Sequence, residues 1–99
     1  SANAWPTDPD IPALAKTGVP GFELDAFFGI VGPAGIDPKV VEKLNQAFVV
    51  AGKKPDIADK LKVTGAIPFP ASVKETQEFL TDQASRWEAV VKASGAKVE

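Results

Sequence analysis

Three side chains that enzymes commonly use for acid–base and nucleophilic chemistry are missing, because the sequence has no His, Cys or Tyr. Imidazole bases, thiolate nucleophiles and the usual nitrogen and sulfur ligands of zinc are therefore excluded. The serines and threonines have no His to activate them, and no spacing indicates a serine–lysine pair. We therefore expect a protein that is not an enzyme and that has no catalytic residue, metal or cofactor.

Carboxylates are the remaining reactive groups, and two close pairs stand out. Asp8 and Asp10 offer oxygen ligands for calcium, but the further ligands and the glycine of an EF-hand loop are absent, so we favour solvated turn residues. Glu23 and Asp25 would share one face of a strand, where they could form an acid–base pair. Because charged residues commonly face water, we favour a solvated strand face.

A glycine-rich stretch at residues 29–37 leads toward a helix N-terminus, where free N–H groups and the helix dipole favour an anion. It lacks the spacing of a dinucleotide-binding fingerprint and the Lys and Ser/Thr of a P-loop. We favour a turn in which Pro33 and Gly35 serve backbone geometry only.

Composition limits the class of protein further. The chain has 99 residues, a 44% apolar fraction, a mean hydropathy of −0.01 and a net charge of −2. One folding unit is therefore expected, and no cationic face for nucleic acid. No apolar run approaches the ~20 residues that span a bilayer. Because no Met is present, we expect a processed or excised end at Ser1 and a piece of a longer protein.

The first half of the chain must position most of these groups. Residues 1–21 hold four of the nine prolines and are expected to form a connector, with a short helical turn between Pro12 and Gly18. Residues 22–31 are rich in aromatic and β-branched residues and form the best strand candidate. A slip of one residue would move two carboxylates into the core, so the register should be firmly specified.

Three helices are predicted in the second half. Asp37 and Pro38 should cap and open the first helix, which should end near Gly52, and Pro55 should open the second, with Gly65 beyond its end. The third and longest helix should begin at a capping box, Ser72 to Glu75, and end where Gly95 can cap it. Its apolar stripe comprises Phe79, Leu80, Ala84, Trp87, Val90 and Val91. Residues 66–70 allow at most a short or edge strand, because Pro68 and Pro70 cannot donate to a ladder.

This inventory predicts an α/β fold with one long strand, a candidate short edge strand and three helices. A lone strand cannot satisfy its own backbone N–H and C=O groups. Its partners must therefore come from the rest of a parent chain or from a second copy, through domain swapping or a shared sheet.

Several motifs resemble the extracytoplasmic solute receptors of tripartite tricarboxylate transporters, the Bug-type family. They are Ile11-Pro12-Ala13, Gly18-Val19-Pro20-Gly21-Phe22-Glu23, Phe27-Phe28-Gly29, Gly32-Pro33-Ala34-Gly35 and Pro38-Lys39-Val40-Val41. The resemblance covers nearly all of the chain but only the last third of a family member. Phe27 stands where the family usually has tryptophan, Ala13 where threonine is common and Gly32 where alanine is common, which leaves the identity of the ligand open.

The resemblance implies the C-terminal fragment of a type II periplasmic binding-protein fold, in which two α/β domains close on a small carboxylate. Residues 1–21 would cross between the domains, and residues 22–99 would form the C-terminal part of the first domain. Asp25, Ala26 and Phe27 would then lie near the crossover and line the ligand cleft.

The function implied is that of a periplasmic receptor that captures a small organic di- or tricarboxylate and delivers it to membrane permease subunits. Because the other parts of the binding site lie outside this chain, we expect these 99 residues alone to bind no ligand tightly. The alternative is a stand-alone, non-catalytic interaction module that completes its sheet by homodimerisation.

Overall fold

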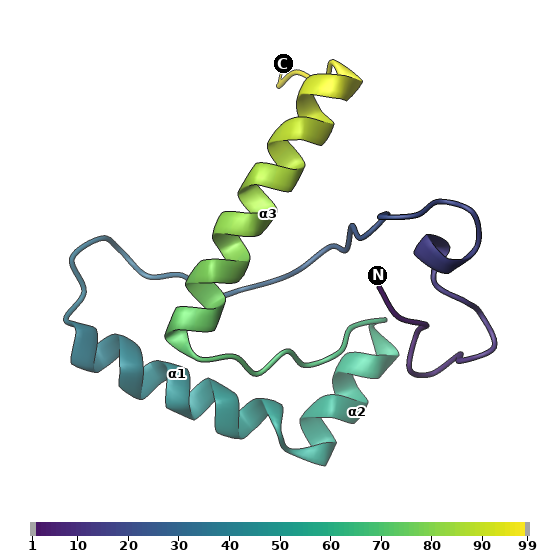
Figure 1. The fold of residues 1–99 in the computed structure, drawn as a ribbon. Helices are drawn as coiled ribbons and strands as arrows, with labels where there is room; N and C mark the ends of the chain where they lie inside the picture. The colour runs from purple at the N-terminus through teal and green to yellow at the C-terminus, as the bar shows by residue number, and fades with distance from the viewer. Residues whose placement is uncertain (1, 99) are drawn as a thin grey trace. The chain divides into compact units, whose positions relative to one another are not determined.

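The computed structural model describes residues 2–98 and consists of helices joined by irregular segments (Figure 1). Its elements are the 3-10 helix η1 (Leu14–Lys16) and the α-helices α1 (Pro38–Gly52), α2 (Pro55–Val63) and α3 (Val73–Ser94). The contacts divide the chain into two compact units, one ending at Gly32 and the other beginning at Pro33. The division into segments 1–21 and 22–99 stays a prediction, and its end residues 1 and 99 lie outside the described residues.

The predicted α/β fold is wrong, because no strand occurs between residues 2 and 98. Residues 22–31, the expected long strand, form an irregular segment, and residues 66–70, the expected edge strand, do the same. Alternating apolar residues are a local pattern, whereas a strand exists only when a neighbour pairs with its N–H and C=O groups. The described chain supplies no such neighbour, so the α/β description and the type II binding-protein fold are not observed.

The unit that ends at Gly32 is built from turns. The N–H of Asp8 donates to the carbonyl of Trp5 (3.1 Å), and the N–H of Ile11 donates to the carbonyl of Asp8 (3.0 Å). The predicted helical turn before Gly18 is confirmed as η1, and Gly18 has a φ of +117°. Ala13, just before η1, is the one buried apolar residue among those described.

The three α-helices begin where their capping signals predicted. The Asp37 carboxylate accepts a hydrogen bond from the N–H of Lys39 (2.8 Å), and Pro38 is the first residue of α1. Pro55 is likewise the first residue of α2, where Lys54 precedes it without a side-chain capping hydrogen bond. At α3 the predicted capping box is present in full, because Ser72 and Glu75 exchange backbone-to-side-chain hydrogen bonds of 2.8 and 3.1 Å.

The helix ends are at or next to the predicted glycines, but for two different reasons. Gly65, just past α2, and Gly95, at the end of α3, have φ values of +74° and +67°, a left-handed geometry that glycine adopts readily. Gly52 closes α1 without a positive φ. Lys54 is instead extended (φ −77°, ψ 131°), as expected of the residue before Pro55, and this ends the helix.

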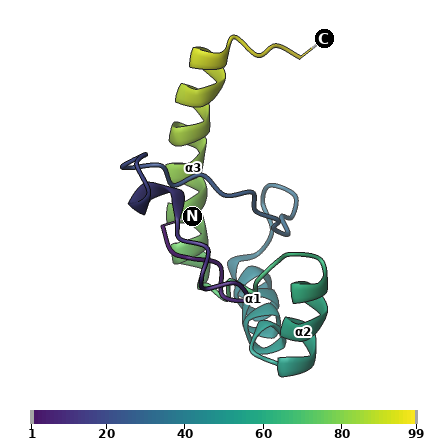
Figure 2. The same cartoon turned by 90° about the vertical axis from the view of Figure 1, so that its right-hand side faces the viewer.

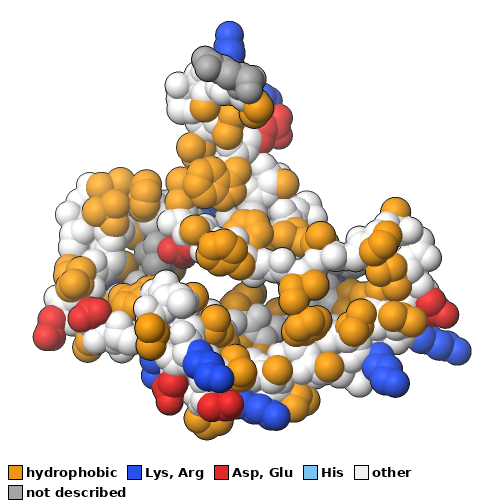
Figure 3. All heavy atoms as spheres, turned by 180° about the vertical axis from the view of Figure 1, so that it is seen from behind, with side chains coloured by type: hydrophobic (Ala, Val, Ile, Leu, Met, Phe, Trp, Pro, Cys, Tyr) orange, Lys and Arg blue, Asp and Glu red, His pale blue; other side chains and the backbone are white. Residues whose placement is uncertain are grey.

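Helix α1 is the centre of the second unit, because it contacts both α2 and α3 (Figure 2). The Asn45 side chain donates a 2.9 Å hydrogen bond to the carbonyl of Ala71, which ties α1 to the segment leading into α3. On that segment the ring of Phe69 packs against Phe79, with centroids 5.5 Å apart. Many hydrophobic side chains nevertheless remain on the surface (Figure 3).

Candidate functional site

Asp25, Ala26 and Phe27, the predicted ligand residues, lie in the irregular segment 22–31 and are exposed. The Phe27 side chain retains 42% of its accessible surface. The three residues are consecutive in sequence, and no helix or strand fixes their geometry. Their assignment to a ligand cleft therefore stays a prediction.

The carboxylate pairs do not form a metal site. Asp8 is exposed and accepts a hydrogen bond from the Thr7 hydroxyl (3.1 Å), as expected of a turn residue. Within residues 2–98 no three acidic side chains come together in a way that could hold a metal ion. Glu23 and Asp25 are exposed, but on an irregular segment rather than on a strand face.

The glycine-rich stretch forms the turn that the sequence favoured. Gly35 has a φ of +82°, which requires a residue that tolerates the left-handed region. The N-terminus of α1 is already capped by the Asp37 carboxylate. A negative charge at this position repels an incoming anion, so the arrangement serves to start the helix.

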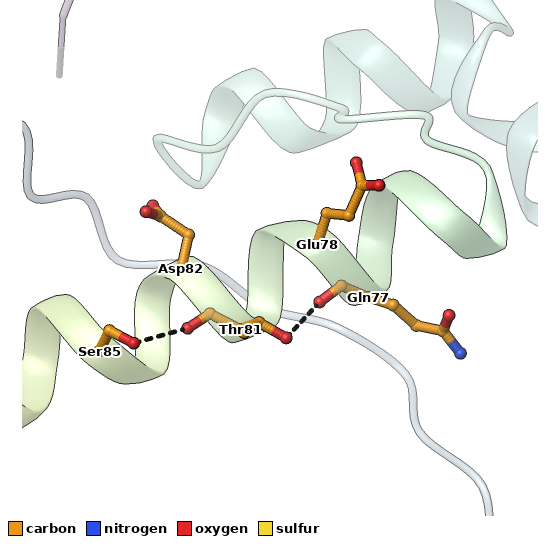
Figure 4. Close-up of a pocket in the computed structure, with 5 residues that line it drawn as sticks. All are labelled: Gln77, Glu78, Thr81, Asp82 and Ser85. Atoms are coloured by element: carbon orange, nitrogen blue, oxygen red, sulfur yellow. Dashed lines mark hydrogen bonds between the residues drawn. The ribbon is translucent and has the colours of Figure 1, made fainter.

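A shallow hollow lies along one side of α3 (Figure 4). All of its lining residues come from this single helix: Gln77, Glu78, Thr81, Asp82 and Ser85. The hydroxyls of Thr81 and Ser85 donate to the carbonyls four residues earlier, at 3.0 and 3.3 Å, as drawn in Figure 4. A hollow formed by one helix face does not enclose a ligand, so we interpret it as solvated surface.

The charges at this hollow are paired along the helix. Asp82 forms an ion pair with Arg86 (2.7 Å) and Glu78 with Lys74 (3.8 Å), each four residues apart. A similar hollow lies on α1 and is lined only by residues of that helix. Among them, the Gln46 amide donates a 3.2 Å hydrogen bond to the Glu42 carboxylate. Such exposed pairs stabilise a helix by only a few tenths of a kcal/mol, ~0.3–0.5 each.

Gln83 is a feature that the sequence interpretation missed. Its side chain is buried, with 9% exposure, and its Oε1 has no hydrogen-bond partner among the described residues. A buried acceptor without a donor costs about 1–3 kcal/mol. The sequence contained an indication of this residue, because helical spacing places the polar Gln83 within the predicted apolar stripe of α3.

None of the helices in residues 2–98 combines the length and the apolar character needed to cross a membrane. The described residues thus contribute helices, caps and an exposed apolar surface, and neither of the two hollows on α1 and α3 encloses a ligand.

Comparison with known proteins gives a more specific result. Residues 5–96 match the family described as the tripartite tricarboxylate transporter family receptor. The chain is 32% identical over 91 residues to Protein BugT of Bordetella pertussis, covering 92% of this chain and 28% of that protein. It is 28% identical over 92 residues to the UPF0065 protein in the tcbD-tcbE intergenic region of Pseudomonas sp. strain P51, covering 92% of this chain and 27% of the relative.

A third relative, the UPF0065 protein in the gbd 5′ region of Cupriavidus necator, is 29% identical over 87 residues, covering 88% of this chain and 26% of the relative. The chain therefore spans about a quarter of the length of these curated relatives. No solved structure matches the chain.

Proposed function

Because the chain belongs to the tripartite tricarboxylate transporter receptor family, we propose that it is the C-terminal part of a receptor for a small organic di- or tricarboxylate. Members of this family are solute-binding receptors, which confirms that the chain is not an enzyme. In our proposal the receptor captures its ligand in the periplasm and delivers it to the permease subunits of the transporter.

The observation that carries this proposal is the family match over residues 5–96, which covers nearly the whole chain. Residues 1–21 would then form the crossover between two domains, and residues 22–99 the C-terminal part of the first domain. The relatives are about four times as long as the matched region, so most of the receptor would lie outside these residues.

Asp25, Ala26 and Phe27 are the ligand-binding residues that we propose within this chain. An ionised Asp25 repels a ligand carboxylate, so its role would be to accept a hydrogen bond from a ligand hydroxyl or protonated group. The backbone N–H groups of Ala26 and Phe27 can donate to a carboxylate, and the Phe27 ring can exclude water beside it.

Isothermal titration calorimetry of the full-length receptor against succinate, malate and citrate tests the proposal. We expect micromolar binding of at least one of them, and a loss of about tenfold or more in the Asp25→Asn variant if the carboxylate accepts a ligand hydrogen bond. Asp10→Asn, which changes an exposed turn carboxylate of the same unit, is the matched control and should leave the affinity unchanged.

Two outcomes would contradict the proposal in different ways. A folded full-length receptor that binds none of the three acids would exclude this ligand class. Equal effects of Asp25→Asn and Asp10→Asn would remove Asp25 from the site. A dimer of the 99-residue chain that binds no carboxylate would instead favour an interaction module.

A further inference from the structure

One side of α1 carries three lysines that we call the lysine row: Lys39, Lys43 and Lys53, the last at the C-cap. At about 100° per residue they fall, together with Gln46 and Val50, within roughly an 80° arc of the helix surface. Some 14 residues separate the first lysine from the last, which corresponds to about 21 Å of helix. All five residues are exposed.

The lysine row does not stabilise α1 itself. Lys39 lies in the first turn, where the helix dipole disfavours a cation and where α1 has no acidic residue. None of the three lysines forms an ion pair within residues 2–98. Glu42, the one carboxylate of α1, accepts a hydrogen bond from the Gln46 amide (3.2 Å). On α3, by contrast, three cations are each paired with a carboxylate four residues away. The charges of the lysine row are thus available to an outside partner.

The lysine row is a surface that faces water in a longer receptor as well. Burying an unpaired ammonium group is far more costly than burying a neutral side chain, so this side of α1 is unsuited to a protein core. The opposite side of the helix is the one that packs, because Val41, Asn45 and Gly52 are half-buried there and Asn45 donates to the carbonyl of Ala71. The partner of the lysine row is therefore a molecule that arrives from solution or from a membrane.

The charge of the region indicates the chemistry of that partner. Residues 38–63 hold six lysines and three carboxylates, a net charge of +3, although the whole chain has a net charge of −2. A cationic surface on an otherwise acidic protein attracts an anionic one over about a Debye length, ~8–10 Å. Membrane proteins concentrate Lys and Arg on their cytoplasmic side, so the periplasmic loops of a permease lack the cations that would repel the lysine row.

We propose that the lysine row is the surface by which the receptor docks, transiently and through charge, onto an acidic patch on the periplasmic side of its permease. This inference rests on the proposed function, since it requires a receptor that delivers its ligand to membrane subunits. A transient contact suits delivery, because complementary charges raise the association rate more than the affinity. A lipid surface fits less well, because a helix that binds in the membrane interface needs a large apolar side, and the row includes only Val50.

The test is the association of the full-length receptor with its permease in nanodiscs of phosphatidylcholine, measured by biolayer interferometry at low and at high salt. The variant that combines Lys39→Gln, Lys43→Gln and Lys53→Gln removes three charges but keeps good helix formers. We expect its association rate to be about tenfold or more below that of the wild type at low salt, and the difference to shrink at high salt.

The matched control combines Lys74→Gln, Lys92→Gln and Lys97→Gln, three exposed lysines of the same unit. It changes the net charge by the same amount, and its association rate should differ from the wild type by less than about twofold. Far-UV circular dichroism shows whether each variant keeps its helices. The wild-type rate provides a test that needs no variant: a rate that does not fall as the salt concentration rises would overturn the proposal.

Equal association rates of the lysine-row variant and the control would overturn the docking surface. Binding of the wild type to empty nanodiscs of equal parts phosphatidylcholine and phosphatidylglycerol, without binding to the permease, would overturn the choice of partner in favour of anionic lipid. Calorimetry with succinate, malate and citrate separates the two proposals. A receptor that binds none of these acids but shows the lysine-row effect would refute the proposed ligand class and support the docking surface.

Discussion

At the scale of single residues, the capping box of α3 includes a titratable side chain, the carboxyl group of Glu75. The Glu75 carboxylate accepts a hydrogen bond from the backbone N–H of Ser72 (2.8 Å), and its own N–H donates to the Ser72 hydroxyl (3.1 Å). Hydrogen bonding to this carboxylate, from the Ser72 backbone N–H first and then from the Ser72 side chain, lowers the pKa of Glu75 from 4.5. The ionised carboxylate is thus the form that the folded helix prefers.

The first prediction is a pH dependence of α3. Because the pKa of Glu75 is lowered on folding, its contribution to stability is present above pH 4.5 and is lost as the pH falls through the lower pKa of the folded state. We expect part of the helical circular dichroism signal to decrease below that pH. The Glu75→Gln variant, whose amide can still accept the bond, should lack this component, and identical profiles of the two proteins would contradict the assignment.

The sequence predicted residues whose role depends on near neighbours in the chain better than residues whose role depends on tertiary packing. Asp37, Ser72 and Glu75 were identified because a cap depends only on residues two or three positions away. Gln83 was missed because its burial depends on tertiary packing, which helical periodicity does not specify. The assignment of Asp25 to a ligand cleft stays a prediction, because residues 22–31 have no helix or strand that fixes its position.

At the scale of elements, one side-chain hydrogen bond joins segments that are far apart in sequence. Asn45 on α1 donates to the carbonyl of Ala71, 26 residues away, from a partly buried position. We expect Asn45→Ala to lower the free energy of unfolding of the second unit by about 1 kcal/mol, since the carbonyl loses its donor. Urea denaturation of the full-length receptor carrying each substitution measures this change. Gln46→Ala, one position along on the exposed side of α1, is the control, and an equal loss in both variants would contradict a specific role for Asn45.

Two glycines near helix ends should respond in opposite directions to the same substitution. A Cβ at Gly52 would lie 3.8 Å from Pro70 Cβ and 3.9 Å from Pro68 Cβ, which is ordinary contact, so Gly52→Ala should stabilise the chain by about 0.4–1 kcal/mol. Gly65 has a φ of +74°, so Gly65→Ala should destabilise it by about 1 kcal/mol or more. Thermal or urea unfolding of the full-length receptor carrying each substitution tests this, and changes of the same sign would show that backbone geometry is not the deciding factor.

The comparison of predicted and observed secondary-structure elements also shows which sequence patterns did not predict the structure. The three helices were predicted because their caps, prolines and apolar spacing are all contained within the helix. Residues 22–31 have the composition of a strand, but strand formation needs hydrogen bonds from a neighbour that the described chain does not contain. The apolar alternation is therefore present without the secondary structure that it usually accompanies.

At the scale of the whole molecule, few of the apolar side chains that the sequence supplies are buried. The described residues include only one buried apolar side chain, Ala13, although 44% of the sequence is apolar. The hydrophobic effect, which is the main term that favours folding, is thus only partly realised within these residues.

The last prediction follows from the small number of buried apolar side chains in these residues. A cooperative transition requires a shared core whose loss exposes a large area at once, and the denaturant dependence of the unfolding free energy scales with that area. We expect the isolated 99-residue chain to unfold gradually in urea, with a slope below about 1 kcal/mol/M and a weak near-ultraviolet signal from Trp5 and Trp87.

Citrate or malate should not shift the unfolding of the isolated chain, because a ligand stabilises only a folded state that binds it. The full-length receptor, measured in the same way, should show a sharp transition that these ligands raise. Coincident, steep transitions of the isolated chain by fluorescence and circular dichroism would instead mean that these residues form a complete core on their own.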